Sequence, residues 1–170
     1  MKSCKIALAQ INPILGNLAY NKNKILKILN KLSGKADLVV FPELSLIGYP
    51  PEDLILREKI HFETSKYLKI IKQFAKDKGI AVILGAPQAI GKKIGNAAIF
   101  FNGNKTTTIF KNNLPNYGVF DEKRIFKEGP PYDYIKYKKL KIGLMICEDM
   151  WTDKIAKRLI KKTVDLFICI

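Results

Sequence analysis

The sequence is poor in the residue types that define several common classes of site. It has a single histidine, His61, and only three cysteines, Cys4, Cys147 and Cys169, which are widely spaced and form no C-x-x-C pair. A disulfide framework needs paired cysteines, and a structural zinc site needs clustered cysteine and histidine ligands, so neither a disulfide framework nor a metal site is expected. A single reactive thiol remains open.

Long apolar runs are also absent. No run approaches the roughly 18 residues needed to span a bilayer, and the opening MKSCKIALAQINP lacks the apolar core of a signal peptide. The 170 residues are 48% hydrophobic and 26% charged, which is typical of one globular domain or part of one. We therefore expect a cytoplasmic protein that does not bind a membrane.

Arginine is scarce although the net charge is +15, because nearly all the positive charge comes from lysine. The lysines are scattered over helical faces, and aromatic residues do not interleave with them as a platform for stacked bases would require. Nucleic acid is therefore not expected as a partner. A basic, non-catalytic module that binds nucleic acid or an acidic partner remains the alternative to an enzyme, and its binding would fall steeply with salt.

Alternating strands and helices, followed by hairpins, predict an α/β layered fold with a mixed sheet. We expect residues 80–84 to form a strand that ends at Gly85-Ala86-Pro87, Asn102-Gly103-Asn104 to form a hairpin turn, 111–131 to form a surface loop and Trp151 to lie in the core. The predicted helices cover residues 17–32, 63–78 and 154–162. The other predicted strands cover 5–10, 37–41, 96–102, 105–110, 134–137, 139–146 and 164–170.

The last predicted strand, VDLFICI, has no following element to cover it. Such a strand would leave a sheet edge and its apolar faces open, and native proteins avoid such edges. We therefore expect the chain to be the N-terminal portion of a longer protein.

Three chemically active side chains follow predicted strands directly. Glu43 comes one proline after a buried strand, Lys111 follows 105–110, and Cys147 follows 139–146. Sites in open α/β sheets lie beyond the carboxyl ends of the strands, so these three side chains can converge. A base, a cation and a thiol could together cleave an amide through a thioester, with Cys147 as nucleophile.

Each residue also has a structural interpretation. A cysteine at a strand end is often a small packing residue, a lysine there is often solvated, and a carboxylate after proline is often a turn or cap residue. His61 has no predicted strand end nearby, so a carboxylate is the better candidate for the base. A helix that begins near Glu148 or Asp149 would stabilise a Cys147 thiolate, although these two acids oppose that effect.

Three segments carry a resemblance to a known family. FPELSLIGYPPEDL (41–54), KNNLPNYGVFDEKRIF (111–126) and MICEDMW (145–151) resemble the carbon-nitrogen hydrolase, or nitrilase, superfamily, and in particular the glutaminase domains of bacterial glutamine-dependent NAD synthetases. The resemblance implies a nitrilase-type αββα sandwich that is incomplete at its C-terminus. It also implies that Glu43 is the general base, Lys111 the oxyanion stabiliser and Cys147 the nucleophile.

The resemblance assigns supporting roles too. Glu122 would position the lysine, and Tyr117 and Phe120 would line the glutamine pocket, although these aromatic side chains could instead pack within their loop. Glutamine would be hydrolysed to glutamate and to ammonia that amidates deamido-NAD. Another carboxamide or a carbamoyl compound is the alternative substrate.

The resemblance also implies what this chain lacks. ATP and deamido-NAD would bind a synthetase domain that is absent here, so no cofactor is expected in these 170 residues. A companion chain or domain would then use the ammonia, and the full-length family member would form a homo-oligomer.

Overall fold

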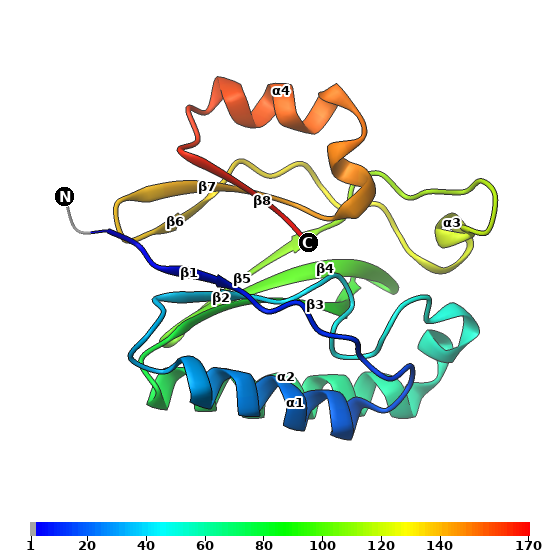
Figure 1. Ribbon diagram of the computed structural model, residues 1–170. Helices are drawn as coiled ribbons and strands as arrows, with labels where there is room; N and C mark the ends of the chain where they lie inside the picture. The colour runs from blue at the N-terminus through cyan, green and yellow to red at the C-terminus, as the bar shows by residue number, and fades with distance from the viewer. Residues whose placement is uncertain (1–2) are drawn as a thin grey trace.

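The computed structural model describes residues 3–170, which form four layers (Figure 1). One layer holds two long helices, the next a five-stranded sheet, the third a three-stranded sheet and the fourth a single helix. The helices are α1 (Leu18–Leu32), α2 (Glu58–Asp77), α3 (Glu122–Ile125) and α4 (Asp153–Lys161), with two short 3₁₀ helices, η1 (Glu52–Leu56) and η2 (Cys147–Met150). The strands are β1 (Ile6–Leu8), β2 (Leu38–Val40), β3 (Ala81–Ile90), β4 (Lys93–Asn102), β5 (Lys105–Phe110), β6 (Ile135–Tyr137), β7 (Leu140–Met145) and β8 (Leu166–Cys169).

The five-stranded sheet has the order β1-β2-β3-β4-β5 and is mixed. Strands β1, β2 and β3 are parallel, whereas β3 pairs antiparallel with β4 and β4 antiparallel with β5. Two reversals of direction restore the original one, so β5 runs in the same direction as β2. The carboxyl ends of β2 and β5 therefore lie at the same edge of this sheet.

The three-stranded sheet has the order β6-β7-β8, and β7 is its central strand. Strand β6 pairs antiparallel with β7, and β8 pairs parallel with β7. This sheet faces the first one, and helix α4 covers its outer face (Figure 1).

Strand alternation explains how the layers pack. In β2, Leu38 and Val40 belong to the core between the sheets, and Val39 belongs to the core under α1 and α2. In β7, Ile142 and Leu144 face the first sheet in the same way. Successive side chains of a strand point to opposite faces, so each buried strand supplies two cores.

Helix α1 begins where its sequence predicts. The side chain of Asn17 accepts a hydrogen bond from the backbone N–H of Tyr20 at 3.1 Å, which satisfies one of the unpaired donors of the first turn. Ile25 and Leu29 lie one turn apart and are fully buried against the sheet.

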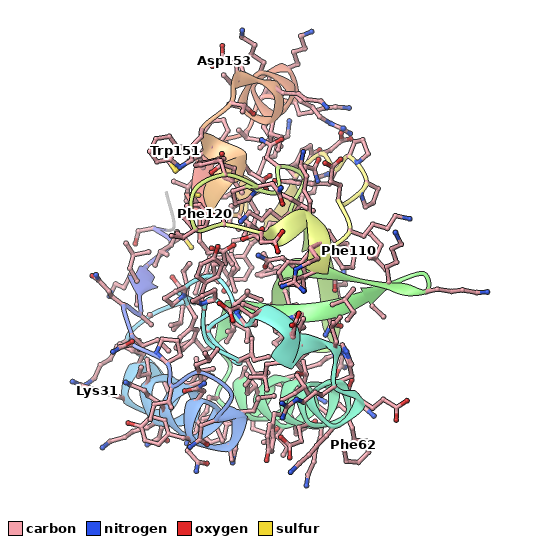
Figure 2. The ribbon with its side chains drawn as sticks, turned by 90° about the vertical axis from the view of Figure 1, so that its right-hand side faces the viewer. Lys31, Phe62, Phe110, Phe120, Trp151 and Asp153 are labelled. Atoms are coloured by element: carbon pink, nitrogen blue, oxygen red, sulfur yellow. The ribbon has the colours of Figure 1, made fainter. Side chains whose placement is uncertain are left out.

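Several expectations about the elements are wrong. Strand β4 begins at Lys93, three residues before the predicted start. Strand β3 continues past Pro87 to Ile90, because beyond Ile83 it pairs only with β4 and an edge position tolerates proline. Helix α2 begins at Glu58, five residues early, and it buries Ile60. The segment 111–131 is not a surface excursion throughout, since it contains α3 and buried side chains. Trp151 is 76% exposed and projects from the surface (Figure 2).

The core around α4 is small, and it consists of Met145, Ile155 and Leu159 with partly buried neighbours.

Among the helices of residues 3–170, none combines the length and the apolar character needed to cross a membrane.

Candidate active site

Glu43 occupies a tight turn that follows β2. Leu44 has a positive φ of 47°, and the turn crosses the backbone of β3 at Gly85. A Cβ atom at Gly85 would lie 2.1 Å from the backbone nitrogen of Leu44, so only glycine permits this approach. The crossing directs the Glu43 side chain over the edge of the sheet, where 13% of it remains exposed.

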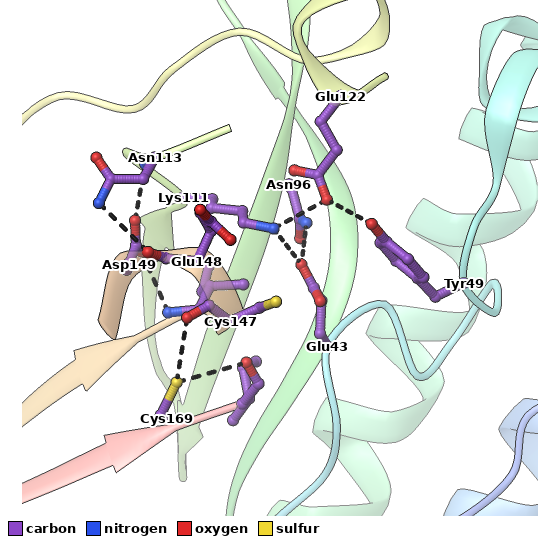
Figure 3. Close-up of polar contacts among 12 residues, drawn as sticks. Glu43, Tyr49, Asn96, Lys111, Asn113, Glu122, Cys147, Glu148, Asp149 and Cys169 are labelled. Atoms are coloured by element: carbon purple, nitrogen blue, oxygen red, sulfur yellow. Dashed lines mark hydrogen bonds and ion pairs between the residues drawn. The ribbon is translucent and has the colours of Figure 1, made fainter. Parts of the chain in front are cut away.

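Lys111 follows β5 at the same edge and is fully buried. Its backbone N–H donates to the carbonyl of Asn96 in β4 at 2.8 Å, which continues the strand ladder by one residue. Its Nζ lies 2.8 Å from Oε1 of Glu43 and 2.9 Å from Oε1 of Glu122. The structure thus brings these three predicted site residues together (Figure 3).

Two further side chains complete this network, and sequence reasoning missed both. Asn96 is fully buried and donates from Nδ2 to Oε1 of Glu43 at 2.7 Å. Tyr49 donates from its hydroxyl group to Oε1 of Glu122 at 3.0 Å. A polar residue at the start of the apolar run NAAIFF was the available signal for Asn96, whereas nothing in the composition of its turn distinguishes Tyr49 from a packing aromatic.

Charge stabilises this buried network. Burial lowers the pKa of Lys111, but the carboxylates of Glu43 and Glu122 more than offset that effect and hold its pKa above the ordinary value. Burial raises the pKa of Glu122, and the Lys111 ammonium opposes the rise. Lys111 is therefore a permanent cation at neutral pH.

Cys147 lies on the second sheet, at the turn that leaves β7. Its φ is positive at 43°, and its backbone N–H donates to the carbonyl of Ile170 at 2.7 Å. A non-glycine residue with positive φ is uncommon, and such strain is often found at functional sites. The Cys147 sulfur points toward Glu43, across the space between the two sheets (Figure 3).

The thiol of Cys147 is protonated at neutral pH. Burial and then the negative charge of Glu43 raise the pKa of Cys147 to about 11, and Lys111 opposes the rise. A protonated thiol is a weak nucleophile, so this cysteine needs a base. Lys111 and Asn96 both occupy Oε1 of Glu43, which leaves Oε2 as the oxygen available to take the proton.

The turn after Cys147 does not begin an α-helix near Glu148 or Asp149. Residues Cys147–Met150 form the 3₁₀ helix η2, and the α-helix begins only at Asp153. Asp149 is fully buried. Its Oδ1 accepts the backbone N–H groups of Asn112 at 2.9 Å and Asn113 at 2.8 Å, and its Oδ2 accepts that of Ile146 at 3.1 Å.

Aromatic side chains lie beside the charged network. The rings of Tyr117 and Phe120 meet edge to face with centroids 5.7 Å apart, and the ring of Tyr49 lies 6.5 Å from that of Phe120. Tyr117 is 57% exposed, and its hydroxyl group donates to Glu148, the neighbour of Cys147, at 3.0 Å. A cavity of about 280 Å³ borders this region and is lined by Tyr49, Phe120, Glu122 and their neighbours.

The remaining thiols do not join the site chemistry. Cys4 and Cys169 are free, and the closest polar contact of the Cys169 sulfur is 3.8 Å, to the carbonyl oxygen of Cys147. Within residues 3–170, no group of three or more histidine, cysteine, aspartate or glutamate side chains is arranged to hold a metal ion.

The fold and this network define a class of protein. The carbon-nitrogen hydrolase family matches residues 5–169, so the chain belongs to that family of hydrolases. The expected αββα architecture is confirmed by solved structures. An amidase from Nesterenkonia sp. superposes with a TM-score of 0.87 at 22% identity, over 98% of this chain and 64% of the amidase, and it supports the fold alone.

Particular relatives narrow the resemblance. The glutamine-dependent NAD(+) synthetase of Acinetobacter baylyi is 39% identical over 97% of this chain, and that of Thermotoga maritima is 41% identical over 89%. The chain spans only 30% and 26% of the lengths of these two relatives. The solved glutamine-dependent NAD+ synthetase of Acinetobacter baumannii superposes with a TM-score of 0.89 at 36% identity, over 99% of this chain and 32% of that protein.

Proposed function

We propose that the chain is the glutaminase portion of a glutamine-dependent NAD synthetase and that it hydrolyses the side-chain carboxamide of glutamine. The observation that carries the proposal is the convergence of Glu43, Lys111 and Cys147 from three strand ends on one space between the sheets. The named relatives, which are glutamine-dependent, supply the choice of substrate.

The first half of the reaction makes a thioester. Oε2 of Glu43 takes the thiol proton while the sulfur of Cys147 attacks the carboxamide carbon. The Lys111 ammonium stabilises the negative charge that develops on the carbonyl oxygen. Glu43 then delivers its proton to the leaving nitrogen, the carbon–nitrogen bond breaks, and ammonia departs.

The second half uses the same residues on water. Glu43 removes a proton from a water molecule, which attacks the thioester carbon, and Lys111 again stabilises the oxyanion. Collapse of this intermediate breaks the carbon–sulfur bond, releases glutamate and returns the proton to Cys147. Glu122 positions the lysine through the 2.9 Å contact between Glu122 Oε1 and Lys111 Nζ. Tyr117 and Phe120, at the edge of the network, line the glutamine pocket.

The rest of the proposed enzyme lies outside these residues. The chain spans about 30% of the length of the relative from Acinetobacter baylyi, and we assign residues 1–170 to the N-terminal portion of the glutaminase domain. A companion domain or chain would bind ATP and deamido-NAD and use the ammonia. We expect a homo-oligomeric, cytoplasmic enzyme, with no cofactor bound by residues 1–170.

A chloroketone analogue of glutamine tests the proposal. The Cys147 thiolate displaces chloride and leaves a thioether that intact-mass measurement detects. We expect one adduct that is absent in Cys147→Ala, retained in the control Cys169→Ala, and slowed by excess glutamine more than by excess asparagine. An adduct on Cys169, or no adduct on soluble, folded protein, contradicts the proposal, and protection by simple amides alone favours an amidase with another substrate.

A further inference from the structure

Asp149 joins the two halves of the site. Its carboxylate accepts two N–H groups from the segment that follows Lys111 and one from Ile146, which precedes Cys147. Lys111 extends a strand of the first sheet and Cys147 a strand of the second. One buried carboxylate therefore bonds the backbones that carry the cation and the nucleophile.

The chemistry of a carboxylate suits this task and no neutral side chain matches it. Each ionised carboxylate oxygen accepts more than one hydrogen bond, and Asp149 uses both oxygens as acceptors only. An asparagine at this position would place an NH₂ group against one set of N–H donors. All three donors to Asp149 are backbone N–H groups.

A side-chain hydrogen bond also joins the segment that follows Lys111 to the one that follows Cys147. Asn113 donates from Nδ2 to Oγ1 of Thr152 at 2.7 Å, just beyond η2. The segment after Lys111 is therefore tied to the turn after Cys147 at two places.

We propose that Asp149 is a positioning residue for the hydrolysis: it holds the Lys111 strand end against the Cys147 turn, so that the ammonium faces the carbonyl oxygen of the bound amide. This inference rests on the proposed glutaminase function. According to this inference, Asp149 affects the reaction rate through Lys111 and does not affect substrate affinity.

Labelling by the chloroketone analogue separates these effects. We expect Asp149→Asn to lower the maximal labelling rate of Cys147 by about ten- to a hundredfold, since small displacements in a site have effects of that size. The analogue concentration that gives half the maximal rate should change less than about twofold, because the groups that bind the analogue stay in place.

A double-mutant cycle tests whether Asp149 acts through Lys111. In the Lys111→Met background, adding Asp149→Asn should slow labelling no further, because there is no cation left to position. The control is Asp165→Asn, which removes another carboxylate that accepts a backbone N–H, that of Lys141 at 2.7 Å, at the opposite end of β7. Wild-type labelling by Asp149→Asn, or effects that multiply in the double variant, overturn the inference.

Amide hydrogen exchange on the wild-type chain needs neither a variant nor activity. The amides of Ile146, Asn112 and Asn113 should exchange slowly and at similar rates, because one carboxylate holds all three. Free exchange at Asn112 and Asn113 overturns the inference even if Asp149→Asn does not fold. A wild-type chain that is not labelled counts against the proposed function instead, and the exchange measurement then decides the role of Asp149.

Discussion

Nζ of Lys111 lies 2.8 Å from Oε1 of Glu43 although the two residues are 68 positions apart in the chain. The same Glu43 oxygen accepts the amide of Asn96, so both contacts fall on one oxygen of the carboxylate and leave the other without them. A carboxylate whose orientation is set in this way suits the role of base that is proposed for Glu43, first toward the thiol and later toward water.

Glu43→Gln should separate thiol reactivity from turnover. Burial and, second to it, the charge of Glu43 raise the pKa of Cys147 to about 11, so removing that charge lowers the pKa and gives more thiolate at about pH 9. Alkylation of Cys147 by iodoacetamide at this pH should become faster in the variant. Labelling by the glutamine analogue near neutral pH should fall by about a hundredfold or more, because the base is lost.

The pH profile of alkylation checks this prediction. The control is Glu148→Gln, which removes an acidic side chain next to Cys147 that is outside the Lys111 network. Slower alkylation of Glu43→Gln at every pH would contradict the assignment of Glu43.

Lys111→Met should destabilise the fold as well as slow labelling. The substitution leaves Glu43 and Glu122 facing each other without their shared cation, and breaking a buried ion pair in this way costs about 3 kcal/mol or more. Urea unfolding measures the loss. The control Lys138→Met removes an exposed pair with Asp37 and should have little effect.

The destabilisation caused by Lys111→Met should depend on pH. The folded pKa of Lys111 lies above its ordinary value of 10.5, so its contribution to stability is present in full below that pH and is lost as the pH rises through the folded pKa. The difference in unfolding free energy between wild type and variant should therefore shrink at alkaline pH. A difference that grows with pH would contradict this account.

Much of the fold follows from local patterns, and the hairpin at Asn102-Gly103-Asn104 and the strand Lys105–Phe110 were predicted with the observed bounds. The length of β3 was not, because a glycine and a proline normally end a strand and only the absence of a β2 partner beyond Ile83 permits them. The exposure of Trp151 was also missed. Hydrophobic character alone does not reveal where a turn points.

The site residues at strand ends were predictable because strand direction limits where they can meet. The structure places Glu43, Lys111 and Glu122 in contact, as the family motifs suggested. Asn96 and Asp149 were not predicted as part of the site. Their hydrogen bonds join segments far apart in the chain, and such pairings arise from tertiary packing and not from any local pattern.

Gly85→Ala should displace the turn that carries Glu43, although Gly85 itself is not a site residue. The added methyl group would meet the backbone of the Glu43 turn at 2.1 Å, and overpacking of this kind costs about 1–3 kcal/mol. We expect lower stability in thermal unfolding and slower Cys147 labelling. The control Gly34→Ala enters open space at a positive φ, so it should lower stability by about 1 kcal/mol without affecting labelling.

Tyr117→Phe should weaken recognition more than chemistry. The substitution removes the hydroxyl group that holds Glu148 beside Cys147 but keeps the ring that meets Phe120. We expect the half-saturating concentration of the glutamine analogue to rise a few-fold with an unchanged maximal rate. The exposed Tyr20 of α1 supplies the control, Tyr20→Phe, and a loss confined to the maximal rate would contradict a binding role for Tyr117.

The site has no scaffold of its own, since Glu43 and Lys111 follow strands of one sheet and Cys147 follows a strand of the other. A slide of one sheet over the other would change the separation of sulfur and carboxylate without breaking a single strand. The apolar contacts between the sheets therefore help to fix the position of one sheet relative to the other. One such contact is the edge-to-face pair of Phe100 and Tyr137, with centroids 5.7 Å apart. Substitutions in the core between the sheets should therefore lower activity even where they lie far from Cys147.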